Sequence, residues 1–460
     1  MSGGPGGAAA PLPRPGSAGY AAAVRAFNLA APLRPDAAVV VRSVDDIRLA
    51  LRRAAAEGLR PRIHTTGHAA GSAGSMAGAL LLRVAPAGRV EVDPLRRVAR
   101  IPAGTPWSAV VAEAAAHRLA VAHGSSPTVG AVGYLLRGGV SFYGRSAGLA
   151  SNLVRAVELV TADGRPRRAA PDCDPELFRA LRGGGGGFGV VTSVEIELLP
   201  VRRVVAGTAF WPAECADPLL DAWLRWCRTA PPEATTSLRV MNLPRVPGIP
   251  PSLTEGPVLG VDGVIVAPDD DLDRAHRVAA GLLGPLRAVA EPLLDTWSVL
   301  APEAVPAVHM DPVEPVPVLG DHMLLADPGS AGAAAFLRVV GAGSGSPLVS
   351  AELRQLGAAL GRPDARGGVL DHLAAAFAYI GAGIADGPVA RDAVAAHHRR
   401  VRTALGPWDT GRTAPTFVET AGQPQGHLEP AKVHEVDRVR VRVDPDGVFR
   451  DDVMPGSSAR

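Results

Sequence analysis

The sequence predicts an α+β protein in which parallel and antiparallel strands are mixed. A strand, a helix and a second strand open the ordered part of the chain, at residues 38–41, 46–57 and 60–63. Two hairpin patterns follow, at residues 89–102 and 153–170. Parallel strands need a long crossover connection, whereas a tight turn joins antiparallel strands, so we expect both kinds of pairing.

Local start and stop signals mark the elements of the first part of the chain. Ser43 and Asp46 have the spacing of a capping box at the start of the first helix, and Gly58 follows its end. Asp163 and Gly164 form a turn pair that favours the second hairpin. Further signals predict a helix over residues 176–181 and a half-buried strand over residues 190–198.

The character of the sequence changes near residue 201, where proline-rich loops begin to separate short helical patches. We therefore expect a first domain over residues 36–202, a second over residues 203–405 and a C-terminal segment over residues 406–460. Residues 1–35 are rich in Gly, Ala and Pro and show no periodicity, so we expect a flexible tail.

The composition predicts a globular protein with a large core. The 460 residues include 53 Gly and 43 Pro, and 47% of them are hydrophobic. Gly and Pro make up about a fifth of the chain, below the roughly 25–30% that marks low-complexity disorder. The 47 basic and 45 acidic residues nearly balance. We therefore expect neither a nucleic-acid partner nor a membrane partner.

The cysteines point to a reducing compartment. Cys173, Cys215 and Cys227 are an odd number without close pairing, which argues against a disulfide framework or a zinc site. The N-terminal residues lack a basic region followed by an apolar stretch, so we expect no signal peptide. The sequence predicts a cytoplasmic protein without a bound metal.

Three glycine-rich loops, over residues 63–74, 124–145 and 182–192, are candidate ligand-binding segments. Small residues let backbone N–H groups approach a ligand, and successive N–H groups form a nest for a diphosphate. No GxGxxG fingerprint opens the first strand–helix unit and no GxxxxGK[ST] motif occurs, so neither of those nucleotide folds is favoured. Each loop by itself would also suit an ordinary surface turn.

Taken in order, the motifs resemble the berberine-bridge-enzyme-like group of FAD-linked oxidases, in the vanillyl-alcohol oxidase and p-cresol methylhydroxylase superfamily. The matching stretches are the TGH loop, the VDP hairpin, the GxxxxVGxxGY segment, PELFRALRGGGGGFGVVTSVEIEL and VDPDGVFR. The resemblance implies a two-part FAD-binding domain of the p-cresol methylhydroxylase type, which the C-terminal segment completes. It also implies a substrate domain with a large antiparallel sheet backed by helices.

The resemblance assigns cofactor-binding roles to residues of the three loops. His68 would be joined covalently to the 8α-carbon of the flavin, because a neutral imidazole nitrogen can add to this electrophilic carbon. The other expected contacts are Thr65, Thr66 and Gly67 at the diphosphate, Val129, Gly130, Gly133 and Gly139 along the flavin and ribityl chain, and Val191 near the adenine.

Several residues depart from the family pattern. Ser126 stands where many members carry a cysteine that forms a second flavin tether, so we expect a single link. Arg137 replaces part of a glycine-rich stretch and would either meet a phosphate or point outward. Ala414 and Thr416 replace a polar pair that often includes an active-site tyrosine.

A base is needed because hydride leaves more easily as the substrate loses an O–H or N–H proton. Glu352, on the alternating segment 349–354, is the candidate carboxylate, and Tyr379 is the candidate phenol. Glu419 is a third choice. The alternative for Glu352 is a solvated strand face on which it pairs with Arg354.

These observations predict an FAD-dependent oxidoreductase that removes hydride from a C–H bond next to oxygen or nitrogen. The substrate would be a small organic molecule, a secondary metabolite or a sugar-like alcohol, and O2 would accept the electrons with peroxide as product. The alternative is a degenerate homologue that binds flavin or another small molecule without turnover. If the protein had a purely structural role, the occurrence of the three glycine-rich loops in the family order would be a coincidence.

Overall fold

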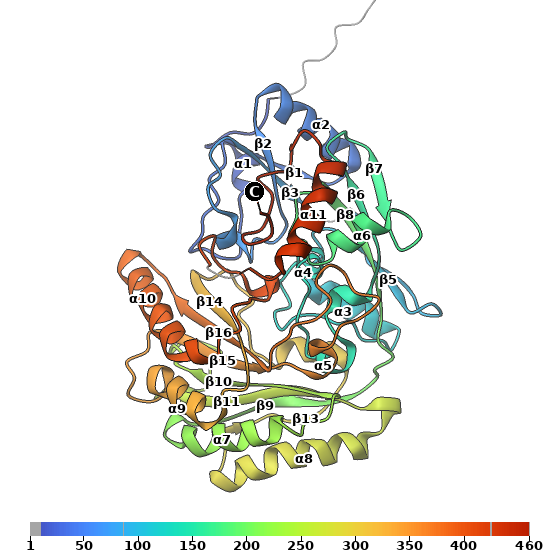
Figure 1. Ribbon diagram of the computed structural model, residues 1–460. Coiled ribbons are helices and arrows are strands. Elements are labelled where there is room, and N and C mark those ends of the chain that lie inside the picture. The colour runs from blue at the N-terminus through green and yellow to red at the C-terminus, as the bar shows by residue number, and fades with distance from the viewer. Residues whose placement is uncertain (1–10, 86, 424–425, 460) are drawn as a thin grey trace, which may run out of the picture.

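The computed structural model describes residues 11–85, 87–423 and 426–459, and the strands within them form three sheets (Figure 1). The first sheet is parallel, in the order β1-β3-β2. Its strands are β1 (Ala37–Val41), β2 (Arg60–His64) and β3 (Ala79–Val84). Helix α2 (Val44–Ala56) connects β1 to β2, and Ser43 and Asp46 form its capping box, as predicted.

The second sheet is antiparallel, in the order β4-β5-β8-β6-β7. It contains both predicted hairpins, β4–β5 and β6–β7. Its strands are β4 (Glu91–Asp93), β5 (Val98–Pro102), β6 (Val154–Val160), β7 (Pro166–Ala169) and β8 (Val190–Glu197). Helices α3 (Trp107–Ala116), α4 (Ala131–Leu136) and α6 (Pro175–Leu181) pack with both small sheets around one hydrophobic core.

The third sheet is large and antiparallel, in the order β12-β9-β11-β10-β15-β16-β14, with β13 beside β9. Its strands are β9 (Val204–Pro212), β10 (Ala234–Met241), β11 (Val258–Val266), β12 (Leu294–Asp295), β13 (Ser298–Leu300), β14 (Val318–Leu325), β15 (Leu348–Gln355) and β16 (Phe377–Ile384). Helices α7 (Ala216–Cys227), α8 (Leu272–Val289), α9 (Gly329–Val340) and α10 (Pro388–Leu405) cover one face. The other face turns toward the two small sheets (Figure 1). None of the described helices is long and apolar enough to cross a membrane.

Residues 11–35 are packed against the first sheet, which corrects the expectation of a flexible tail over residues 1–35. Helix α1 (Ala18–Ala23) begins at Ser17, whose hydroxyl accepts from the Tyr20 N–H. Ala23 and Leu33 are buried in one cluster with residues of β1 and β3. A six-residue helix is too short to produce a visible period in the sequence. The first ten residues of the predicted tail lie outside the described residues.

The C-terminal segment packs closely against the third glycine-rich loop. A Cβ atom on Gly185 would lie 2.2 Å from the Ser457 Oγ, and one on Gly186 would lie 2.4 Å from the Asp452 carbonyl oxygen. Both glycines have positive φ, at 79° and 88°. The glycine run is therefore required for close contact with the end of the chain.

Arg440, on helix α11 (Pro430–Val443), holds this contact together. Its Nε donates to the Gly186 carbonyl at 3.0 Å, and its Nη1 donates to the Ser457 carbonyl at 2.7 Å. It also pairs with Asp437 at 2.6 Å. The Arg440 side chain is only 9% exposed, so these partners replace water almost completely.

Replacement of Arg440 with methionine should lower the free energy of unfolding by about 3 kcal/mol, because buried carbonyls lose a donor and the Asp437 carboxylate loses its cation. Arg442 is the matched control: its side chain is 43% exposed and pairs with Asp174 at 2.6 Å. Arg442→Met should cost less than about 1 kcal/mol. Urea unfolding measures both values. Equal losses of unfolding free energy in the two variants would contradict the role given to Arg440 in this contact.

Candidate functional site

The loop after β2 is held in one conformation by the packed N-terminal segment. The Phe27 N–H donates to the Thr66 carbonyl at 3.0 Å. Gly67 has a φ of 79°, and a Cβ atom there would lie 2.5 Å from the Ala26 Cα, so only glycine fits. The ring of His68 stacks on Phe27, with 3.8 Å between the centroids. The position of the imidazole is thus fixed by contacts within the chain.

His68 joins this loop to the second glycine-rich segment. Its Nε2 lies 2.9 Å from the Thr128 Oγ1, which in turn lies 3.1 Å from the Ser126 Oγ. Burial lowers the pKa of His68 to about 4, so the imidazole is neutral at pH 7. The two positions that sequence analysis linked to flavin attachment, His68 and Ser126, therefore lie on either side of one threonine.

The glycines of the second segment have different surroundings. A Cβ atom on Gly130 would lie 2.6 Å from the Thr65 Oγ1, and one on Gly139 would lie 2.4 Å from the Tyr134 ring. Gly133 is exposed on α4, and a Cβ atom there would meet nothing within 4 Å. Gly130 and Gly139 are thus required by packing, whereas Gly133 leaves open space beside the loop.

Three other predicted contacts lie in different places. The hydroxyl of Thr66 accepts from the Gly130 N–H at 3.2 Å. The carbonyl of Val129 accepts from the Trp107 N–H at 3.0 Å. Val191 is 8% exposed and lies opposite Leu159 in the second sheet. Thr66 therefore lies within the loop that holds His68, Val129 precedes Gly130, which binds Thr66, and Val191 belongs to β8.

Arg137 points inward, which rules out the outward alternative. Its Nη2 donates to the Ser72 Oγ at 3.2 Å, and its buried Nη1 has no hydrogen-bond partner among the described residues. Burial raises the pKa of Glu419 and of Asp452 to about 7, although Arg137 opposes this shift in both. These carboxyls are half neutralised near pH 7, so the guanidinium suits a further anionic group such as a phosphate.

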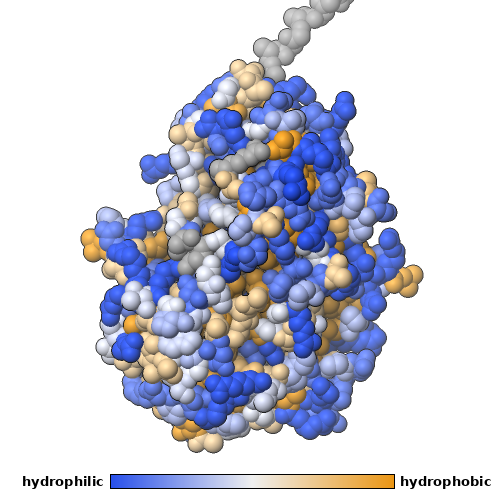
Figure 2. Space-filling view, viewed as in Figure 1, coloured by the Kyte–Doolittle hydropathy of each residue, from blue (hydrophilic) through white to orange (hydrophobic). Residues whose placement is uncertain are grey.

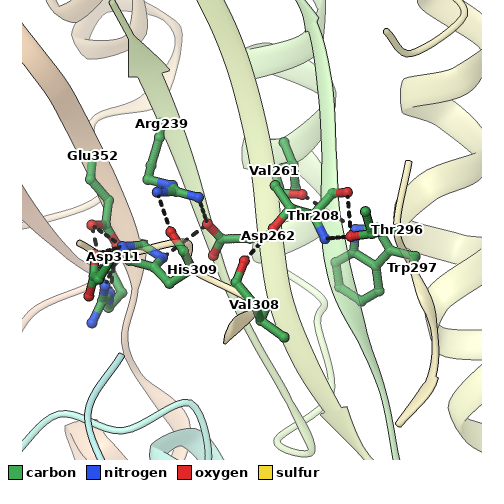
Figure 3. Close-up of polar contacts among 11 residues, drawn as sticks. Thr208, Arg239, Val261, Asp262, Thr296, Trp297, Val308, His309, Asp311 and Glu352 are labelled. Atoms are coloured by element: carbon green, nitrogen blue, oxygen red, sulfur yellow. Dashed lines mark hydrogen bonds and ion pairs between the residues drawn. The ribbon is translucent and has the colours of Figure 1, made fainter. Parts of the chain in front are cut away.

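Five charged side chains form a buried cluster on the face of the large sheet opposite helices α7–α10 (Figure 3). On one side, the Arg354 Nε lies 2.6 Å from the Glu352 Oε1, and on the other the Arg239 Nη2 lies 2.6 Å from the Asp262 Oδ2. The strand register pairs Arg239 with Glu352, so both side chains leave the same face. We call Arg239, Asp262, His309, Glu352 and Arg354 the ion cluster.

His309 bridges the two halves of the ion cluster. Its Nδ1 lies 3.0 Å from the Asp262 Oδ2, and its Nε2 lies 3.4 Å from the Glu352 Oε2. The sequence analysis missed His309, because the proline-rich loop that carries it has no period. It also missed Arg239 and Asp262. A single charged residue within an otherwise uncharged strand was the signal that could have identified them.

The ion cluster meets the glycine-rich segment. The Arg354 guanidinium lies 5.4 Å from the Phe142 ring centroid and 5.5 Å from that of Phe417. Phe142 packs in one buried cluster with residues of β9 and β11. Pro127, from the second glycine-rich segment, and Asp311, from the loop that carries His309, both line a pocket of about 410 Å³. Figure 2 shows pale and apolar residues gathered between the two lobes of the molecule.

Tyr379 lies on the other face of the large sheet, which contradicts its interpretation as an active-site phenol. It pairs with Leu353, whose side chain is buried under the helices, whereas Ile380 pairs with Glu352. Its ring centroid lies 6.4 Å from that of Phe336 on α9. Neighbouring residues of a strand point to opposite faces of the sheet, so the face on which Tyr379 lies depends on how its strand is paired.

Glu352 lies on the same face of the large sheet as Arg239, and it is buried at 3% exposure and is not on a solvated surface. Its pairing with Arg354 is present, as the alternative proposed. Glu419 lies beside Gly320 and in the electrostatic range of Arg137, and no contact joins it to the ion cluster. Among the described residues, no group of three His, Cys, Asp or Glu side chains is placed to hold a metal ion.

Comparisons with known proteins agree with this arrangement. Residues 35–170 match a family of FAD binding domains. (R)-6-Hydroxynicotine oxidase of Paenarthrobacter nicotinovorans is 35% identical over 179 residues, which are 39% of this chain and 39% of that protein. The chain matches about two fifths of the length of such curated relatives.

Solved structures share the fold over nearly the whole chain. The crystal structure of 6-hydroxy-D-nicotine oxidase from Arthrobacter nicotinovorans has a TM-score of 0.81 at 23% identity, over 96% of each chain. Physcomitrella patens BBE-like 1 has a TM-score of 0.78 at 18% identity, over 97% of this chain and 96% of that one. The predicted fold class and the resemblance are therefore confirmed. The chain carries an FAD-binding domain over residues 35–170, and it shares the fold of these solved structures over nearly its whole length.

Proposed function

We propose that this protein is an FAD-dependent oxidoreductase that takes hydride from a C–H bond next to oxygen or nitrogen of a small organic substrate and passes the electrons to O2. The ion cluster carries this proposal. Buried ion pairs are often no more stable than apolar residues of the same size, so five buried charges are weak evidence for a structural role. A homologue that only held flavin would not need them on the face that meets the glycine-rich segment.

The residues around His68 fit the cofactor. Thr65, Thr66 and Gly67 would lie at its diphosphate, and the unpartnered Nη1 of Arg137 would meet one of its phosphate oxygens. Gly133 leaves space for a flat ring. Bound FAD supplies the hydride acceptor and its reoxidation by O2. His68 would carry the single covalent link through Nδ1, because Thr128 already occupies Nε2.

Glu352 would act as a positioning residue and not as the base. Burial raises its pKa, but Arg354 and His309 outweigh that effect and hold the pKa well below its usual range. A carboxylate of such low basicity keeps its charge near neutral pH and takes protons poorly. It would instead orient Arg354 and His309 toward the substrate. Secondary metabolites that carry an amine or an alcohol are the substrate class that we propose.

The proposal is tested by the colour and the reactivity of the purified protein. It should absorb near 450 nm, as oxidised flavins do. Under anaerobic conditions an amine or alcohol from a panel of secondary metabolites should bleach this band, and admission of air should restore it with release of peroxide. A colourless protein that binds no FAD would contradict the proposal. Bound flavin that no compound reduces would support the alternative without turnover.

The flavin should be attached through His68 alone. Acid precipitation should leave a yellow pellet, and the intact mass should show one FAD adduct. His68→Ala should lose the adduct, because a neutral imidazole is the attacking nucleophile. Cys173→Ala is the control, since that exposed thiol lies in a different loop, and it should keep the adduct. An adduct that survives His68→Ala would show that another residue is attached.

Glu352→Gln and Tyr379→Phe should have different effects, although both residues lie in the same sheet. Glu352→Gln should slow flavin reduction at least tenfold, or ~1.4 kcal/mol, because Arg354 and His309 lose their shared carboxylate. Tyr379→Phe removes a hydroxyl on the helix-covered face and should stay within about threefold of the parent rate. Anaerobic stopped-flow absorbance measures both rates. If Tyr379→Phe slowed flavin reduction more than Glu352→Gln did, the active site would lie on the helix-covered face of the sheet, contrary to this proposal.

A further inference from the structure

His309 has an environment that suits a group that gains and loses a proton. Its side chain is 6% exposed, and its Nδ1 lies 3.0 Å from the Asp262 Oδ2. That contact holds the proton of the neutral ring on Nδ1 and leaves the lone pair on Nε2. The tautomer is therefore assigned by the carboxylate beside it.

The Nε2 atom has a partner in either protonation state. The neutral ring accepts from the Arg354 Nη2 at 3.2 Å. The protonated ring would face the Glu352 Oε2 at 3.4 Å. A buried polar atom that loses its partner costs free energy, so a donor and an acceptor at similar distances allow the proton to be taken up without that cost.

The loop that carries His309 is clamped onto the sheet. The Thr208 Oγ1 donates to the Val308 carbonyl at 2.5 Å, and the Arg239 Nη1 donates to the His309 carbonyl at 2.8 Å (Figure 3). These two contacts fix the two peptides on either side of the His309 Cα. The imidazole is thus held in place before any ligand binds, as a base in an active site requires.

We propose that His309 is the base of the oxidation and that Asp262 is its positioning residue. The inference rests on the proposed function. The substrate's O–H or N–H bond breaks, its proton moves to the His309 Nε2, and its electron pair forms the new C=O or C=N bond. The hydride leaves the neighbouring carbon for the flavin, and O2 finally takes both electrons and two protons to give peroxide.

Asp311 connects His309 to solvent. Its carboxylate lies 3.9 Å from the His309 Nε2, and its side chain is 27% exposed. It also lines the pocket of about 410 Å³. After each turnover, the proton held by His309 would leave through Asp311 into this pocket, which restores the neutral ring for the next substrate.

The groups around His309 determine its pH dependence. Burial and Arg239 lower its pKa, but the carboxylates outweigh them and raise it to about 9. The charged groups that face it are Arg239 on β10, Asp262 on β11, Asp311 on its own loop, and Glu352 and Arg354 on β15. Only the neutral ring accepts a proton. The rate of flavin reduction should therefore increase with pH as His309 loses its proton, and the midpoint of this acid limb of the pH–rate profile should report the pKa of His309.

Anaerobic flavin reduction, measured against pH in the flavin-loaded protein, tests the role of His309. His309→Gln should lower the rate by about 10²–10⁴-fold and abolish the acid limb. His372→Gln is the matched control, because His372 pairs with Asp371 at 2.6 Å outside the ion cluster. It should keep both the rate and the limb. A His309→Gln variant that retains the parent limb would overturn the proposal.

Removal of a neighbouring carboxylate should shift the limb. Asp262→Asn and Asp311→Asn should each move it to lower pH, since a charge that favours the imidazolium is lost. Asp311 is partly exposed, so its variant decides the question if the buried variants do not fold. A limb unchanged in Asp311→Asn would overturn the proposal.

A readout without turnover separates this inference from the proposed function. NMR of 15N-histidine in the flavin-loaded parent should show one ring that titrates above neutral pH and that disappears in His309→Gln. That signal should move to lower pH in Asp311→Asn. If no compound reduces the flavin, the proposed function fails. If the flavin is reduced but no ring titrates in this way, His309 is not the base.

Discussion

Neutralisation of charge inside the molecule is the constraint on which the site depends. The register of β10, β11 and β15 places Arg239, Asp262, Glu352 and Arg354 on one face of the large sheet, where all four side chains are buried. Removal of one member would leave an uncompensated buried charge. His309 completes the set from a separate loop. The geometry of the cluster is therefore fixed by electrostatics as much as by strand pairing.

The same face explains why the two halves of the molecule stay together. Phe142, from the second glycine-rich segment, packs with residues of β9 and β11 and lies beside Arg354. Arg145, a few residues further on, donates to the carbonyls of Ala230 and Ala234. Apolar packing and buried hydrogen bonds thus hold the second glycine-rich segment against the large sheet.

Local signals could be predicted from the sequence, and long-range placement could not. The capping box at Ser43 and the loop around His68 depend on residues that are close in the chain, and both were identified. The face on which Tyr379 lies depends on its pairing with Leu353, which no local pattern contains. His309 was missed for the same reason, because its partners come from three different strands. The glycine run near Gly185 was identified, but its contact with Ser457 depends on residues more than 200 positions away.

The contact between Arg440 and the third glycine-rich loop affects the order in which parts of the protein fold during synthesis. Its acceptors Gly184 and Gly186 leave the ribosome more than 250 residues before Arg440 does. The whole large sheet is translated between them. Closure of so long a loop is slow and comes late. The glycine loop of the first two sheets must therefore stay uncovered until the segment around Arg440 has been synthesised.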